Sequence, residues 1–138
     1  MALQNLNSHA SDSARCVAAR ITESPFGELI LYGTVLPGNA DPRARKGESL
    51  QTFADELEQQ KLDWLRISRD FPTATLVVAG DFNQDLAARH YYGSASKRQR
   101  LGQVLDDCDL TVQTAGSDDP IARDSAPRAC IDHICIST

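Results

Sequence analysis

Several features of known protein classes are missing from this sequence of 138 residues. It has no apolar run near the roughly 20 residues that span a bilayer, so a membrane-spanning protein is not indicated. Its four cysteines show neither a CxxC pair nor zinc-finger spacing, which argues against a zinc ribbon or a disulfide scaffold. The N-terminus lacks the basic and apolar regions of a secretory signal. We therefore expect a reduced, cytoplasmic protein with no membrane partner.

Two further absences concern chemistry and charge. No glycine-rich phosphate loop and no Ser-His-Asp or Cys-His arrangement can be read from the sequence. The net charge of −5 opposes sequence-independent binding to a polyanion, because that affinity comes mostly from cations. The two basic clusters, "RARK" at 43–46 and "KRQR" at 97–100, are expected to be solvated surface segments.

The chain length fits one domain, and 41% hydrophobic residues are enough for a core. Residues 1–15 are expected to form a flexible N-terminal arm, and residues 16–138 a single domain. Periodicity predicts helices at 48–70 and 96–107 and strands at 16–21, 29–35, 75–79, 110–114 and 129–138. The first two strands should form a hairpin, and "TLVVA" at 75–79 a central strand covered on both faces. Alternating helices and strands place the chain in the α/β (α+β) class.

The stretch "GDFNQDL" carries the first candidate site, because Asp81 and Asn83 follow directly on the apolar strand. Sheet-based enzymes often place functional groups at such strand ends. If the extended geometry continues, alternate side chains face the same space. A carboxylate can hold Mg²⁺ or accept a proton from water, and a carboxamide can donate to a phosphoryl oxygen. The combination suits phosphoester hydrolysis.

Two other interpretations of this stretch were weighed. Asp and Asn are common turn residues, and their spacing alone does not separate a site from a turn. Asp81, Asn83 and Asp85 also match the first ligand positions of a calcium loop. Leu86 stands at the glycine position of that loop and Tyr92 at its bidentate glutamate position, so a calcium loop is rejected.

The second candidate site is the pair Asp132 and His133 in "CIDHICI". Neighbours in a strand point to opposite faces, so only one of the two can enter a given site. Asp132 would share its face with Cys130, Ile134 and Ile136, and a carboxylate among apolar groups is costly unless it has a partner. That cost favours Asp132 as the functional residue. His133 is expected to pack or hydrogen-bond on the other face.

A strand ending in "GDFN", followed by a helix and a strand reading "IDHI", resembles the endonuclease/exonuclease/phosphatase superfamily of Mg²⁺-dependent, DNase-like phosphoesterases. The resemblance implies a two-sheet β-sandwich flanked by helices, of which residues 16–138 are a part. It implies Mg²⁺ or Mn²⁺ as cofactor and hydrolysis of a phosphodiester or phosphomonoester by activated water. Asp81 would bind the metal and orient that water, Asn83 would bind the scissile phosphate, and Asp132 would orient a catalytic histidine other than His133.

The sequence also departs from the pattern of this superfamily. The metal-binding glutamate that usually precedes the strand at 29–35 has no counterpart, and neither has the Ser-Asp-His motif that usually follows the "IDHI" strand. Val35 stands where the superfamily often carries Tyr or His, and Asn39 is a possible substitute. The alternative function is therefore an incomplete domain that acts only through association with a partner. A small binding module with an accidental "GDFN" is a third reading.

The substrate class is left open by the sequence, with nucleic acid among the candidates. Tyr91, Tyr92, Arg89 and Lys97 are the nearest candidates for contacting it, although a solvated loop is the more ordinary role for these residues. If strands that normally flank the sheet are missing, its edges are uncovered, and we expect the isolated chain to self-associate through them.

Overall fold

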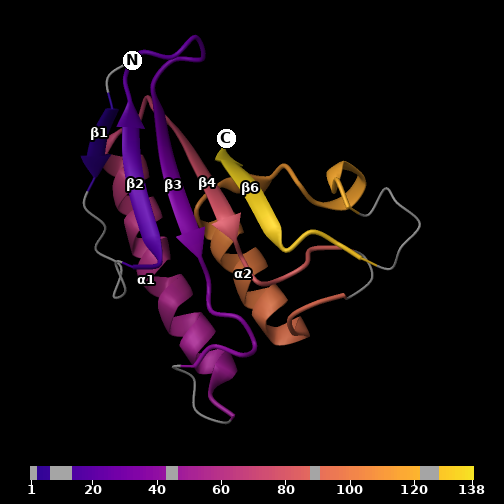
Figure 1. The fold of residues 1–138 in the computed structure, drawn as a ribbon. Helices are drawn as coiled ribbons and strands as arrows, with labels where there is room; N and C mark the ends of the chain where they lie inside the picture. Colours follow the sequence, from indigo (N-terminus) through magenta and orange to yellow (C-terminus); the bar gives the residue numbers. More distant parts are fainter. Residues whose placement is uncertain (1–2, 7–13, 43–46, 88–90, 122–127) are drawn as a thin grey trace.

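The computed structural model describes residues 3–6, 14–42, 47–87, 91–121 and 128–138. They form one mixed sheet of six strands in the order β1-β2-β3-β4-β6-β5, with two helices on one face (Figure 1). The strands are β1 (Leu3–Leu6), β2 (Cys16–Ile21), β3 (Leu29–Val35), β4 (Thr75–Asp81), β5 (Leu110–Val112) and β6 (Asp132–Ser137). The helices are α1 (Ser49–Asp70) and α2 (Ala95–Asp107), followed by a short 3-10 turn at Gly116–Asp118.

Strands β2 and β3 form the predicted hairpin. Its turn is closed by a hydrogen bond from the Gly27 backbone N to the Ser24 carbonyl (3.2 Å), and Gly27 has a φ of 89° that favours glycine. Strand β3 then pairs in parallel with β4, because α1 crosses over and returns the chain to the same end of the sheet. Strand β6 pairs antiparallel with β4 on its other side. The carboxyl ends of β3 and β4 therefore lie together.

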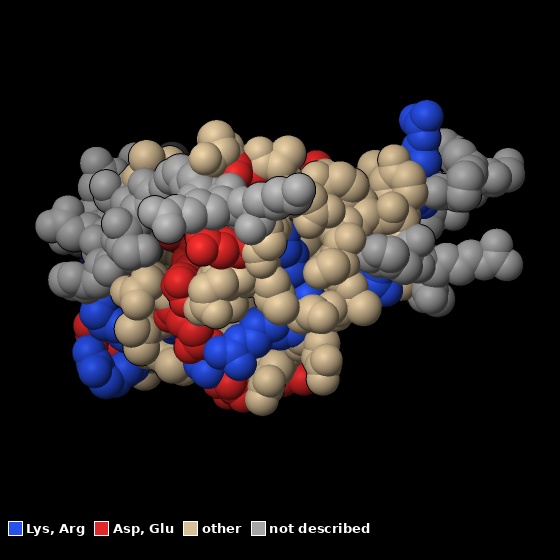
Figure 2. Space-filling view, turned by 90° about the horizontal axis from the view of Figure 1, so that it is seen from below, with Lys and Arg blue, Asp and Glu red and all other residues tan. Residues whose placement is uncertain are grey.

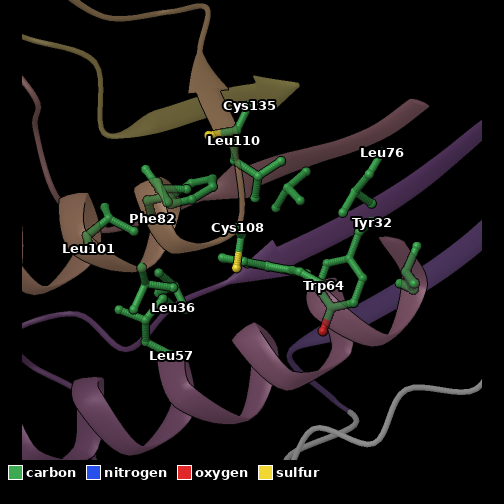
Figure 3. Packing of buried hydrophobic residues seen from close by; sticks show 14 of the residues in the cluster. Tyr32, Leu36, Leu57, Trp64, Leu76, Phe82, Leu101, Cys108, Leu110 and Cys135 are labelled. Atoms are coloured by element: carbon green, nitrogen blue, oxygen red, sulfur yellow. The ribbon is translucent and has the colours of Figure 1, made fainter. Parts of the chain in front are cut away.

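The core lies between the sheet and the helices (Figure 3). Alternate residues of β3 and β4 point into it, as the period of two in a strand requires. The fully buried side chains include Ile30, Tyr32, Val78, Trp64 and Leu101, and Tyr32 packs edge-on against Trp64 at 6.0 Å between ring centroids. Helix α2 buries Leu101, Val104 and Leu105.

Helix α1 buries Phe53, Leu57 and Trp64, which recur at helical spacing along one face. Leu50 and Leu65 are exposed, whereas Gln60 and Asp63 are fully buried. The Tyr32 hydroxyl donates to the Asp63 carboxylate (2.9 Å), which satisfies the polar group inside the core. Hydrogen bonds to strand side chains thus set the rotation of this helix along with apolar burial.

The other face of the sheet carries no helix, so the prediction that 75–79 is covered on both faces is wrong for the described residues. The apolar side chains there retain much of their exposure: Val17 64%, Leu31 40%, Val35 45% and Ile134 43%. The reason is that α1 and α2 both pack on the face of Ile30 and Val78. The described residues hence form one sheet with one helical layer, and no second sheet.

The N-terminal segment differs from the predicted flexible arm. Leu3–Leu6 pairs with β2 as an edge strand inside the stretch predicted to be an arm, because the outer edge of β2 offers free backbone hydrogen-bonding groups. Neither helix of the described residues is long and apolar enough to cross a membrane. The "RARK" cluster at 43–46, and Arg89, lie outside the described residues.

Candidate functional site

Strand β4 runs two residues beyond its predicted end and finishes at Asp81. Gly80 allows this extension, because it lies directly beside Thr34 of β3. A Cβ atom at position 80 would lie 1.9 Å from the Thr34 carbonyl oxygen, and the φ of Gly80 is 149°. Only glycine fits here, and its close approach to β3 brings Asp81 to the carboxyl edge of the sheet.

Asp81 pairs directly with Asp132 of β6 across the antiparallel ladder. Burial raises the pKa of the Asp81 carboxyl, and the negative charge of Asp132 raises it further. A hydrogen bond from the Asn83 backbone N to Asp81 Oδ1 (2.8 Å) acts in the opposite direction. The carboxylate therefore lies where its negative charge is disfavoured, a setting that a cation would relieve.

Asn83 comes close to Asp81 by a turn, and not by the extended geometry on which the sequence argument depended. Its φ of 51° is left-handed, which ends the strand. Its Nδ2 donates to the Leu36 carbonyl (2.9 Å), and its Oδ1 lies 2.9 Å from where a Cβ of Gly38 would be. The loop after β3 thus fixes the position of this carboxamide. One of the two Nδ2 hydrogens is used by Leu36, and the Asn83 side chain also hydrogen-bonds to Asp81, which lowers the pKa of that carboxyl.

Asp132 is exposed, which corrects the expectation that it lies as a costly carboxylate among apolar groups. Its face is the helix-free one, where Ile134 is also 43% exposed, so solvent reaches the carboxylate. Cys130 donates from Sγ to the Asp132 carbonyl (2.9 Å), a contact with the backbone only. Burial therefore gives no support for a functional Asp132. The support comes from the position of Asp132 opposite Asp81.

His133 lies on the opposite face and is 1% exposed. Its Nε2 contacts the Gln84 carbonyl (2.8 Å) and its Nδ1 contacts the Thr114 hydroxyl (3.1 Å). Thr114 Oγ1 also accepts from the Ile134 backbone N (3.1 Å). Because a carbonyl oxygen only accepts, Nε2 donates to Gln84, and this network joins β6 to the segment after β4. The prediction that His133 packs or hydrogen-bonds on the other face is confirmed.

The sequence argument missed the residues that hold the site loop. Asp85 is fully buried and accepts from the backbone N of Tyr91 (2.9 Å) and Tyr92 (2.7 Å). Arg98 of α2 donates to both carboxylate oxygens of Asp85, at 3.1 and 3.2 Å. Asp85 therefore points into the protein and away from any shared ligand position with Asp81, consistent with the rejection of a calcium loop. A short polar side chain after a strand was the one available signal.

Lys97 was predicted to lie on a solvated face, and the structure contradicts this for one residue of the "KRQR" cluster. Lys97 is 2% exposed, whereas Arg98 and Arg100 are partly exposed. The reason is that Lys97 begins the inward face of α2, four residues before the buried Leu101. Tyr91, by contrast, is 49% exposed beside the site loop.

Carboxylate and carboxamide oxygens are the ligands that Mg²⁺ prefers, and Asp81 and Asp132 provide two carboxylates at one edge. The described residues hold no group of three or more His, Cys, Asp or Glu side chains that could hold a metal ion. Figure 2 views the molecule from the side toward which β3 and β4 run, and shows acidic side chains next to lysine and arginine side chains. The donor set fits part of a magnesium site, with water or a substrate oxygen needed to complete it.

Comparison with solved structures identifies the architecture. The human Nocturnin catalytic domain matches 100% of this chain with a TM-score of 0.59 and 15% identity. The chain has a DNase-I-like fold. This is the fold of the endonuclease/exonuclease/phosphatase superfamily, as the resemblance of "GDFN" and "IDHI" implied. No protein-family model and no curated protein matches the sequence.

Two other solved structures share this fold. The 3′-5′ exonuclease NExo of Neisseria meningitidis matches 98% of the chain with a TM-score of 0.57 and 21% identity. A beta toxin variant of Staphylococcus aureus with bound magnesium ions matches 90%, with a TM-score of 0.55 and 15% identity. The chain covers 47% of the Nocturnin structure, 57% of NExo and 42% of the toxin, so it spans about half the length of these proteins.

Proposed function

We propose that this chain carries part of a metal-dependent phosphoesterase site, in which activated water hydrolyses a phosphodiester or phosphomonoester. One observation carries the proposal: a single turn holds the Asp81 carboxylate and the Asn83 carboxamide at the carboxyl edge of a DNase-I-like sheet. Asp132 lies opposite Asp81 on the neighbouring strand. Two solved structures of the same fold are an exonuclease and a toxin with bound magnesium, which supports the proposal.

Each of these side chains has a role that its chemistry allows. A bound Mg²⁺ or Mn²⁺ would polarise a phosphoryl oxygen and lower the pKa of a water ligand. Asp81 would hold the metal and orient the attacking water, since its carboxylate is partly buried and its Oδ1 is fixed by Asn83. The Asn83 carboxamide would donate to a phosphoryl oxygen and add no negative charge. Asp132 would supply a second carboxylate.

A second function has its own supporting observation. The helix-free face of the sheet exposes Val17, Leu31, Val35 and Ile134 together, a larger apolar surface than single scattered residues make. This favours a chain that completes its fold, and its site, only by association with another polypeptide segment. The two functions are distinguished by whether the chain turns over substrate alone.

The test is hydrolysis of bis(p-nitrophenyl) phosphate, p-nitrophenyl phosphate and a single-stranded DNA oligonucleotide by the purified chain, with Mg²⁺, with Mn²⁺ and with a chelator. We expect metal-dependent turnover that falls about 100-fold or more in Asp81→Ala and in Asn83→Ala. The matched control is Asp107→Ala, because Asp107 is an exposed carboxylate on α2 that pairs with Lys61.

The control separates loss of the site from loss of one surface charge. Metal-dependent turnover that is unchanged in Asp81→Ala would contradict the assignment of the site. A chain that melts cooperatively but shows no turnover on any of the three substrates would contradict hydrolysis by the chain alone and support the association function.

A further inference from the structure

Lys97 is a buried cation that the proposed chemistry does not use. Its side chain leaves the first turn of α2, where the Ser94 hydroxyl accepts from the Lys97 backbone N (3.2 Å). The ammonium Nζ donates to Asn39 Oδ1 (3.0 Å) and to Ser49 Oγ (2.7 Å). It also lies 5.5 Å from the centre of the Phe53 ring. The residue is 2% exposed and joins three segments that are far apart in the sequence.

Core packing alone does not explain a lysine at this position. Burial lowers the pKa of Lys97, and only the charge of Asp41 raises it. An apolar side chain of similar length would fill the same volume without desolvating a charge. The two hydrogen bonds therefore serve a geometric purpose, because both acceptors are neutral side chains: Asn39 lies in the segment after β3, and Ser49 begins α1.

The segment after β3 also fixes the position of the Asn83 carboxamide. At its start, the Leu36 backbone N donates to the Asp81 carbonyl (2.8 Å), and the Leu36 carbonyl accepts from Asn83 Nδ2 (2.9 Å). A Cβ atom on Gly38 would lie 2.9 Å from Asn83 Oδ1, so the carboxamide would have to move to admit one. Asn39, the next residue, is held by Lys97. The segment Leu36–Asn39 is thus fixed by β4 at one end and by Lys97 at the other.

We infer that Lys97 is a positioning residue: by anchoring Asn39 and Ser49 it fixes the Leu36–Asn39 segment, and through that segment it fixes the Asn83 carboxamide. It does not contact substrate itself, since its hydrogen bonds go to protein acceptors and it is sealed from solvent. The expected effect of Lys97 on catalysis rests on the proposed function. Its effect on the position of the Asn83 carboxamide rests on geometry alone.

The structural test uses the side-chain amide signals of Asn83 in NMR spectra of the full chain. Lys97→Met keeps the length and apolar bulk of the side chain and removes the donors. We expect the Asn83 Nδ2 signals to shift or broaden in Lys97→Met. The control is Lys61→Met, which removes another lysine whose partner, Asp107, is on the protein surface; its Asn83 signals should match the wild type. Unchanged Asn83 signals in folded Lys97→Met would overturn the inference.

The kinetic test is a double-mutant cycle. Lys97→Met should lower kcat about tenfold with little change in KM, because a displaced carboxamide loses mainly transition-state contacts. In an Asn83→Ala background the same substitution should change kcat less than twofold. An equal tenfold loss in both backgrounds would show a general structural effect and overturn the inference.

Two further controls keep the outcomes separate. If Lys97→Met does not fold, Ser49→Ala removes one acceptor while the lysine stays, and the Asn83 signals decide the question in the same way. If the wild type shows no hydrolysis, the proposed function fails, whereas the NMR comparison still supports or overturns the positioning role.

Discussion

Asp81 and Asp132 lie directly opposite each other on the antiparallel strands β4 and β6, at the open end of the sheet. Two carboxylates in this relation repel each other when both are ionised. The pKa of Asp81 is raised, first by burial and then by the charge of Asp132. The account of the site depends on this pair, because a divalent cation between the two strands would remove the repulsion.

The raised pKa predicts how stability depends on pH. The folded chain holds the Asp81 proton more tightly than the unfolded chain, whose Asp pKa is about 3.9. The contribution of protonated Asp81 is therefore complete below about pH 3.9 and is lost as pH rises through the raised value. Asp81→Asn keeps the oxygen that accepts from Asn83 and removes the charge. With a chelator present, the melting temperature of Asp81→Asn should be at least equal to that of the wild type at pH 3.5. The difference in its favour should grow as the pH is raised to 7. A margin that shrinks over this range would contradict the direction of the shift.

Gly80 predicts a large loss of stability on a minimal substitution. In Gly80→Ala the new Cβ would meet the Thr34 carbonyl oxygen, so β3 and β4 would have to separate. We expect a loss of about 3 kcal/mol in the free energy of unfolding, measured by urea denaturation. Gly102→Ala is the control, because its Cβ meets nothing within 4 Å on α2, and it should gain about 1 kcal/mol. A similar small effect of both substitutions would disprove the close approach at Gly80.

The elements that local pattern controls were predictable from the sequence. The hairpin of β2 and β3, the long helix α1 and the strand ending at "GDFN" all follow from periodicity and turn residues. Asp81 and Asn83 became candidate site residues because they directly follow an apolar strand. The burial of Asp63 on α1 was not predictable, since it depends on a hydrogen bond from Tyr32, a residue 31 positions away.

The residues that hold the site in place could not be identified from the sequence, because they too depend on contacts between segments that are far apart in it. Asp85 and Lys97 look like surface residues in the sequence, and their partners Arg98 and Asn39 are identified only when α2 and the loop after β3 are placed side by side. Asp132 was selected by an argument from burial that the exposed face of β6 does not support. Its pairing with Asp81 depends on the register of two strands, which the sequence pattern leaves open.

The ion pair of Asp85 and Arg98 predicts that the site loop is a stabilising element. Asp85→Ala leaves Arg98 without its bidentate partner and frees the backbone N of Tyr91 and Tyr92. We expect a loss of about 3 to 5 kcal/mol in unfolding free energy. Asp107→Ala, at a surface pair with a carboxylate side chain that is 45% exposed, should cost about 1 kcal/mol or less. Equal losses in the two variants would mean that Asp85 acts as an ordinary surface carboxylate.

The helix-free face predicts self-association. Strands β1 and β5 are the edges of the sheet, and Leu31 and Val35 lie exposed on its open face. We expect sedimentation velocity to show species larger than a monomer, and Leu31→Lys to shift them toward the monomer. Leu62→Lys is the control, because Leu62 is 57% exposed on α1 and should change nothing. A wild-type chain that sediments as a single sharp monomer would refute association through this surface.

The central claim is that Asp81 belongs to a metal site, and a magnesium titration followed by ¹H–¹⁵N NMR tests it most directly. The account predicts saturable shifts of the backbone signals of Asp81, Asn83 and Asp132, with the His133 side of the sheet little changed. The shifts should disappear in Asp81→Asn and persist in the Asp107→Asn control. Shifts confined to other carboxylates, or identical titrations of wild type and Asp81→Asn, would contradict the claim.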